Sequence, residues 1–195
     1  RPETDPTLAG LRMLEPYQAE KIPILFVHGL FSDPQTYLEM ANHIRACPEL
    51  ASRYQIWVFR YPTGGNFFLS AAKLRQQLAS LVAQCEAKGA DRHLREMVIV
   101  GHSLGGLVAK LQVTDSGSTL WNNVARVPLD QLVATPAQRE KLQSEFFFGA
   151  SPYIKTAIFI AVPNEGSPWA HRPVGKIASR MVKYSPQQTE MHRTL

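Results

Sequence analysis

The stretch that decides the fold is MVIVGHSLGG, residues 97–106. Its first four residues are apolar on both faces, which is typical of a strand buried in a parallel sheet. Gly101, Ser103 and Gly105 follow, and a helix is predicted to begin near Leu104. A sharp turn from strand to helix strains its serine, raises the hydroxyl above the sheet and requires small neighbours. Ser103 is therefore predicted to be an exposed nucleophile; a glycine-rich turn with an incidental serine is the alternative.

Apolar runs on either side of this stretch predict the rest of the sheet. Further strands are expected over 22–27, 55–61 and 154–162, and helices over 34–46, 69–88, 104–115, 138–148 and 174–184. Alternation of strands and helices demands a parallel sheet with right-handed crossovers. The predicted fold class is α/β, with a mostly parallel sheet, about four clear strands and helices on both faces.

One domain is expected over residues 1–195, because this length and the 45% apolar content suit a single core. Residues 1–20 are polar and punctuated by prolines, so an irregular N-terminal arm is expected there. Residues 115–152 break the alternation of strands and helices. We interpret them as an insertion or lid-like segment over the carboxyl edge of the sheet.

Composition excludes several function classes. The net charge is +5, but the basic residues are scattered, so no nucleic-acid partner is expected. No apolar run approaches the ~18 residues that suggest a transmembrane segment. Cys47 and Cys85 are too few for a disulfide framework or a zinc cluster, so no metal is expected. The chain begins at Arg1 without an apolar leader, as a mature or trimmed chain does, so its localisation stays unknown, and a secreted or periplasmic one is compatible.

The same turn predicts an anion site. The Leu104 N–H would lie at a helix N-terminus, where backbone amides lack partners and the helix dipole favours negative charge. A second amide is expected from the loop after the strand over 22–27, and Leu30 is the residue placed to donate it. His28 and His102 are interpreted as structural histidines that support these two turns.

The string PILFVHGL (residues 23–30) together with GHSLGG (residues 101–106) resembles the α/β-hydrolase superfamily. Within it the chain is similar to lipases and esterases of the GPI-inositol-deacylase-like branch, although Asn164 or Glu165 stands where that branch has a histidine. The resemblance implies hydrolysis of a carboxylic ester through an acyl-serine on Ser103. It also implies two oxyanion amides, a Ser–Asp/Glu–His triad in that order, and no cofactor. The family places the helices that carry Cys47 and Cys85 on opposite faces of the sheet, so the resemblance also implies that no disulfide joins these cysteines.

The acid and the base of such a triad are not evident in the sequence. Residues 104–195 contain one further clear strand, whereas the family places the acid and the histidine after two more. Three explanations are open: the chain is the N-terminal part of a longer hydrolase, its partners come from another subunit, or residues present here replace them. In the last case Glu165 would be the acid and His171 or His192 the base.

Apolar residues near the predicted site indicate the substrate. Leu30, Phe31 and Leu104 with the run 146–148 would form apolar walls for a small-molecule or lipid-like ester, although the three phenylalanines of that run could instead pack in the core. A catalytically silent binding module is the alternative function. An open sheet edge would also favour a homodimer.

Overall fold

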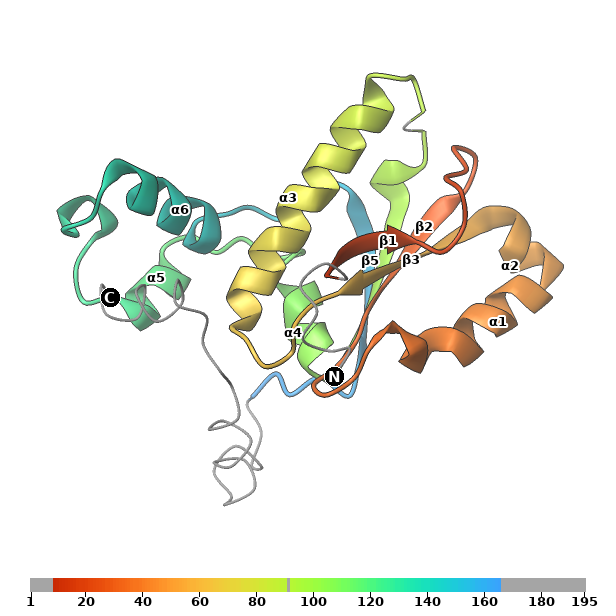
Figure 1. Ribbon diagram of the computed structural model, residues 1–195, viewed down its shortest axis with the longest axis horizontal. Coiled ribbons are helices and arrows are strands. Elements are labelled where there is room, and N and C mark those ends of the chain that lie inside the picture. Colours follow the sequence, from red (N-terminus) through yellow and green to blue (C-terminus); the bar gives the residue numbers. More distant parts are fainter. Residues whose placement is uncertain (1–8, 91, 166–195) are drawn as a thin grey trace, which may run out of the picture.

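A five-stranded sheet forms the centre of the protein, of which the computed structural model describes residues 9–90 and 92–165. The strand order is β1-β3-β2-β4-β5, and all neighbours pair in parallel except β1, which is antiparallel to β3 (Figure 1). The strands are β1 (Gly10–Met13), β2 (Ile22–Val27), β3 (Tyr54–Arg60), β4 (Met97–His102) and β5 (Ile154–Ile160). The predicted α/β class with a mostly parallel sheet is confirmed.

Helices cover both faces of this sheet, because the central strands are apolar on both sides. Leu25 and Val27 pack in one core layer with α3 and α4, whereas Ile24 and Phe26 pack in a second layer with α1. The helices are η3 (Pro34–Tyr37), α1 (Leu38–Ala46), α2 (Pro48–Arg53), α3 (Phe67–Glu86), η4 (Leu94–Glu96), α4 (Leu104–Lys110), α5 (Thr119–Val124), η5 (Leu129–Gln131) and α6 (Pro136–Phe146).

The N-terminal region differs from the irregular arm expected over residues 1–20. Gly10–Met13 forms the edge strand β1, so the described sheet has five strands rather than four. Leu11 and Met13 pack against the core, and the Leu11 N–H donates to Gln77 Oε1 at 2.8 Å. These contacts come from distant parts of the chain, which explains why local pattern did not predict them. The expected helix over 174–184 lies outside the described residues.

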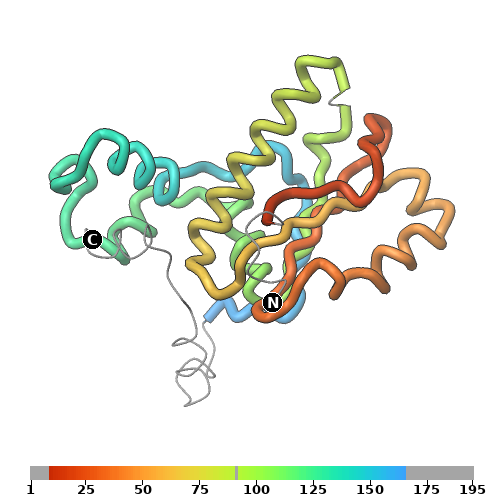
Figure 2. Tube along the Cα trace, in the orientation of Figure 1, coloured from red at the N-terminus to blue at the C-terminus, as the bar shows by residue number. Residues whose placement is uncertain are grey.

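The segment expected as an insertion, 115–152, carries α5, η5 and α6 and lies beside α3, away from the sheet (Figure 2). It has a small core of its own around Trp121, Leu142 and Phe146. Arg75 of α3 fastens it to the main body. The guanidinium carbon lies 3.5 Å from the centroid of the Phe148 ring, and Nη2 donates to the Glu145 carbonyl at 3.4 Å.

The strand β5 pairs with β4, and its other edge has no strand partner among the described residues. Ile158 and Phe159 of this strand are exposed. The homodimer through an open edge stays a prediction, which sedimentation would test. Neither Cys47 nor Cys85 forms a disulfide, as expected. Among the helices described, none combines the length and the apolar character that crossing a membrane requires.

Candidate active site

Ser103 lies at the sharp turn that the sequence predicts. The strand β4 ends at His102, α4 begins at Leu104, and Ser103 between them has φ 51° and ψ −121°. A positive φ is uncommon for a residue with a side chain and persists where the surrounding structure enforces it. Here the Ser103 N–H donates to the Ile160 carbonyl of β5 at 2.9 Å, and its own carbonyl accepts from the Gly106 N–H at 3.0 Å. The neighbouring strand therefore fixes the serine in place.

Three glycines make this turn sterically possible. A Cβ at Gly101 would lie 2.6 Å from the Gly106 Cα, and one at Gly106 would lie 1.9 Å from Val162 Cγ2. A Cβ at Gly105 would lie 2.1 Å from the carbonyl oxygen of Val27. The helix α4 therefore approaches both the end of β2 and the segment after β5 more closely than any side chain allows.

The loop after β2 lies against the serine. A Cβ at Gly29 would lie 3.1 Å from Ser103 Cβ, so this glycine brings the loop into contact with the turn. In the same loop, the Phe31 N–H donates to Thr63 Oγ1 at 3.2 Å. Within residues 9–90 and 92–165, neither the Leu30 N–H nor the Leu104 N–H donates a hydrogen bond. The role of these two amides as oxyanion donors stays a prediction.

His28 is a structural histidine, as the sequence predicts. It is 1% exposed, its ring stacks on that of Tyr61 with centroids 4.6 Å apart, and its Nδ1 lies 3.1 Å from the Gly29 carbonyl. The Tyr61 N–H donates to His28 Nε2 at 3.4 Å. Both ring nitrogens therefore contact backbone groups of the loop region. His102 is half-buried, and its Nδ1 has no hydrogen-bond partner in the described part of the chain.

Two buried tyrosines that the sequence reasoning missed hold the end of β2. The Tyr37 hydroxyl donates to the Val27 carbonyl at 2.8 Å, and the Tyr61 hydroxyl donates to the His28 carbonyl at 2.7 Å. Burial raises the pKa of both phenols well above the ordinary value, so both stay protonated donors at neutral pH. Tyr61 lay inside the strand predicted over 55–61, and no local signal in the sequence marked either tyrosine as a support for the end of β2.

Of the residues expected as the acid and the base, the structure describes Glu165 alone. Glu165 is exposed in the turn after β5 and forms no ion pair with any described residue. Its neighbour Asn164 is anchored, because Lys110 Nζ donates to Asn164 Oδ1 at 3.1 Å. His171 and the alternative base His192 lie outside the described residues.

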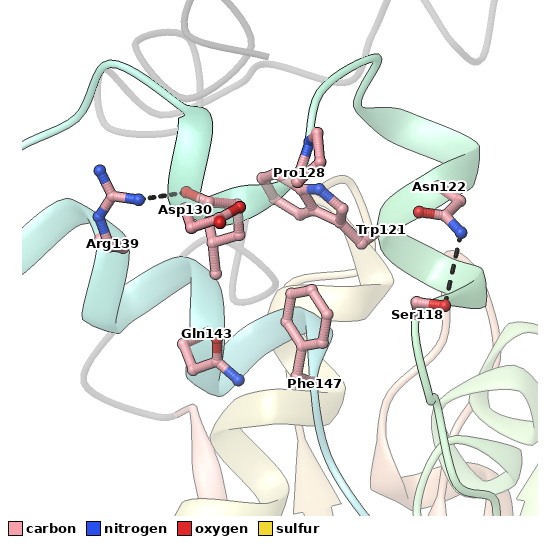
Figure 3. A pocket seen from close by; sticks show the side chains of 9 residues that line it. Ser118, Trp121, Asn122, Pro128, Asp130, Arg139, Gln143 and Phe147 are labelled. Carbon is pink, nitrogen blue, oxygen red and sulfur yellow. Dashed lines mark hydrogen bonds between the residues drawn. The ribbon is translucent and has the colours of Figure 1, made fainter.

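The three phenylalanines expected as pocket walls pack elsewhere. Phe146 is buried against Trp121 with ring centroids 5.6 Å apart, and the Phe148 ring lies under Arg75. Phe147 lines a cavity of about 430 Å³ inside the insertion (Figure 3). None of the residues lining that cavity belongs to the serine turn or to the loop after β2. The three phenylalanines therefore pack within the insertion, which was the alternative to a role as pocket walls. The insertion needs them because it has an apolar core of its own.

Leu30 and Phe31 follow Gly29 in the loop after β2. Their side chains are 43% and 57% exposed, which is high for large apolar residues. Phe31 has φ 53°, a second positive φ on a residue with a side chain. Ala161, directly after β5, also has a positive φ of 49°, so strained residues follow three of the parallel strands, and such residues are enriched at functional sites.

Comparison with known proteins identifies the family. The model of the alpha/beta hydrolase family matches residues 24–191. Among solved structures, the chain is similar to the Bacillus licheniformis lipase BlEst2 in mature form, at 18% identity and a TM-score of 0.46, covering 88% of this chain and 56% of the lipase. It is also similar to an acetylxylan esterase, at 16% identity and a TM-score of 0.43, covering 75% of this chain and 65% of the esterase.

A third similar structure is Thermogutta terrifontis esterase 2 phosphoramylated by tabun, at 13% identity and a TM-score of 0.41, covering 78% of this chain and 50% of that one. The chain thus spans about half to two thirds of the length of these structures. No curated protein matches it. The expected placement in the GPI-inositol-deacylase-like branch is not confirmed, whereas the superfamily is. The chain belongs to the alpha/beta hydrolase family.

Proposed function

We propose that the protein is a serine hydrolase that cleaves carboxylic esters through an acyl-serine on Ser103. The observation that carries this proposal is the geometry of Ser103. Its φ of 51° at the end of β4 is strained, and Gly29 lies close enough that a Cβ there would be 3.1 Å from Ser103 Cβ. Such a turn presents a hydroxyl to a bound substrate with two backbone donors beside it.

In the proposed reaction, Ser103 Oγ forms a bond to the ester carbonyl carbon and gives its proton to a base. The carbonyl oxygen becomes an oxyanion that accepts hydrogen bonds from the N–H groups of Leu30 and Leu104. The C–O bond to the alcohol then breaks, and the alcohol leaves with the proton. Water next attacks the acyl-serine, which releases the acid and restores the hydroxyl. Loss of one oxyanion donor lowers kcat by about 10²–10³ in known cases.

Glu165 and His171 are the acid and base of this proposal. Glu165 follows β5, which runs parallel to β4, so both strands direct their carboxyl ends to the edge of the sheet where Ser103 lies. Ile160, the last residue of β5, accepts the hydrogen bond of the Ser103 N–H. Replacing Glu165 by Gln or His171 by Gln would each lower kcat at least as strongly as loss of an oxyanion donor. An unchanged kcat in either variant would remove that residue from the triad.

The proposed substrate is a small-molecule or lipid-like ester with an apolar acyl group. Its support is the pair Leu30 and Phe31, two exposed apolar residues in the loop that carries one of the proposed oxyanion amides. Turnover of p-nitrophenyl acetate, butyrate and octanoate would therefore rise with acyl length. Phe31→Ser would flatten this dependence, because one buried methylene contributes about 0.8 kcal/mol. A preference for acetate in the unaltered protein would contradict the apolar acyl group.

The decisive assay measures p-nitrophenyl butyrate hydrolysis by the unaltered chain, by Ser103→Ala and by Ser52→Ala. Ser52 is an exposed serine of α2 whose hydroxyl donates to the Glu49 carbonyl, so it serves as the matched control. Ser103→Ala would abolish turnover, and Ser52→Ala would retain it. Equal turnover in all three proteins would refute Ser103 as the nucleophile. No turnover in the unaltered chain would favour a binding module instead.

A further inference from the structure

The loop after β2 is fastened to the residues that follow β3, on both sides of Leu30. On the N-terminal side, the Tyr61 hydroxyl donates to the His28 carbonyl at 2.7 Å, and the two rings stack with centroids 4.6 Å apart. On the C-terminal side, the Phe31 N–H donates to Thr63 Oγ1 at 3.2 Å. The parallel pairing of β2 with β3 brings these two segments together, so residues 61–63 support the loop that carries one proposed oxyanion donor.

Both peptide groups that flank the Leu30 Cα have an atom in a hydrogen bond. His28 Nδ1 lies 3.1 Å from the Gly29 carbonyl oxygen and donates to it, because its Nε2 accepts a backbone N–H and so carries no proton. The peptide bond between Gly29 and Leu30 is trans and planar, so the Leu30 N–H points away from the His28 ring. The next peptide group, between Leu30 and Phe31, is held by the hydrogen bond to Thr63.

We propose that Thr63 is a positioning residue, whose hydroxyl oxygen fixes the peptide group after Leu30 and thereby the direction of the Leu30 N–H. Phe31 has φ 53°, which a residue with a side chain adopts where its surroundings enforce it. The side chains of Leu30 and Phe31 are exposed and give the loop little packing, so its hydrogen bonds must hold it. The catalytic consequence rests on the proposed ester hydrolysis, whereas the link between the two segments does not.

Three substitutions separate the oxygen of Thr63 from its bulk. The residue is 9% exposed, and valine has the same branched shape at Cβ, so Thr63→Val keeps the packing and removes the acceptor of the Phe31 N–H. Thr63→Ser keeps the oxygen and removes only the methyl group. Thr63→Ala removes the same acceptor with a smaller side chain, so its effect on the loop must agree with that of Thr63→Val.

A loss of this hydrogen bond would act on the transition state more than on substrate binding. Thr63→Val would lower kcat about tenfold, less than the ~10²–10³ that follows complete loss of an oxyanion donor, because the Leu30 N–H is misdirected rather than removed. KM would stay within about twofold, since the neutral ester makes little use of this donor. Thr63→Ser would keep both kcat and KM within about twofold of the unaltered chain.

Ser116→Ala is the matched control. Ser116 Oγ accepts the Phe148 N–H at 2.8 Å, and both this bond and the bond from Phe31 to Thr63 join residues 32 positions apart. Ser116 is 6% exposed and belongs to the insertion, which lies beside α3 and away from the sheet (Figure 1). Ser116→Ala therefore removes an equally buried acceptor of a backbone N–H. It would cost a similar amount of thermal stability and keep kcat and KM unchanged.

The test combines steady-state hydrolysis of p-nitrophenyl butyrate with amide exchange measured by NMR on the ¹⁵N-labelled chain. In Thr63→Val and Thr63→Ala, the Phe31 amide proton would exchange about tenfold faster, because its acceptor is gone. In Thr63→Ser it would exchange as in the unaltered chain, and in Ser116→Ala only the Phe148 amide would exchange faster.

Three results would overturn the proposal: unchanged Phe31 exchange in Thr63→Val, an unchanged kcat in that variant, or a kcat that falls equally in Thr63→Ser. The last result would assign the effect to the methyl group rather than to the oxygen. If the unaltered chain has no turnover, the proposed function fails, and the Phe31 exchange still decides whether Thr63 fixes the loop.

Discussion

Replacing Gly105 by alanine tests the close approach of α4 to the end of β2. The added Cβ would lie 2.1 Å from the Val27 carbonyl oxygen and 2.3 Å from that of His28. Both oxygens belong to the backbone, and each already accepts a hydrogen bond from a buried tyrosine hydroxyl. Neither can move aside as a flexible side chain would, so α4 must shift away from the sheet.

The size of the effect follows from this overlap. Overpacking costs about 1–3 kcal/mol, and a clash with fixed backbone belongs at the upper end of that range. The gain of up to ~1 kcal/mol from replacing a helical glycine by alanine offsets part of it. A net loss of about 2 kcal/mol would lower Tm by about 4–8 °C for a chain of this size. A displacement of about 1 Å at the oxyanion site would also lower kcat about a hundredfold.

Thermal unfolding and p-nitrophenyl butyrate turnover measure the two effects in parallel. Gly64→Ala is the matched control, because a Cβ at Gly64 meets nothing within 4 Å. That variant would keep its activity and melt at or slightly above the temperature of the unaltered chain, since alanine restricts the unfolded state. A Gly105→Ala protein with the Tm and kcat of the unaltered chain would refute the tight contact between α4 and β2.

Three further predictions concern the insertion. Burial raises the pKa of the Glu145 carboxyl above 4.5. The free energy of unfolding therefore falls as the pH rises from about 4.5 through the raised pKa, because the unfolded chain loses this proton first. Glu145→Gln would raise the urea midpoint at about pH 7.5 and leave it unchanged at about pH 4. Arg75→Met would remove the cation over the Phe148 ring, lose about 2 kcal/mol and speed proteolysis within residues 115–150. Trp121→Ala would cost about 3–5 kcal/mol in the small core of the insertion, measured by local hydrogen exchange. An unchanged urea midpoint in Glu145→Gln would contradict the burial of that carboxyl. An unchanged cleavage rate in Arg75→Met would contradict the contact with Phe148, and unchanged hydrogen exchange in Trp121→Ala would contradict the small core.

The centre of the fold was predictable because its requirements are local. The apolar run before Gly101 can only be buried on both faces, and a serine between glycines at the end of such a run needs a turn. The observed strand Met97–His102 and the helix that begins at Leu104 agree with that prediction. The choice of Leu30 as a second donor also rested on a local feature, the strand that ends in His28-Gly29.

The parts that were missed depend on distant contacts. β1 has four residues, too few for a periodic signal, and is defined by its pairing with β3. Tyr37 and Tyr61 act through hydrogen bonds to carbonyls 10 and 33 residues away, and no spacing in the sequence indicates them. The phenylalanines at 146–148 could have served either a pocket or a core, and only the position of the insertion decided between the two.

Labelling with a fluorophosphonate probe, followed by mass spectrometry of the peptides, tests the central claim most directly. The probe forms a stable bond to an activated serine hydroxyl, so the adduct itself identifies the nucleophile. We expect one adduct, on Ser103, which disappears in Ser103→Ala and persists in Ser52→Ala. An adduct on another serine, or an unlabelled protein, would contradict the assignment of Ser103.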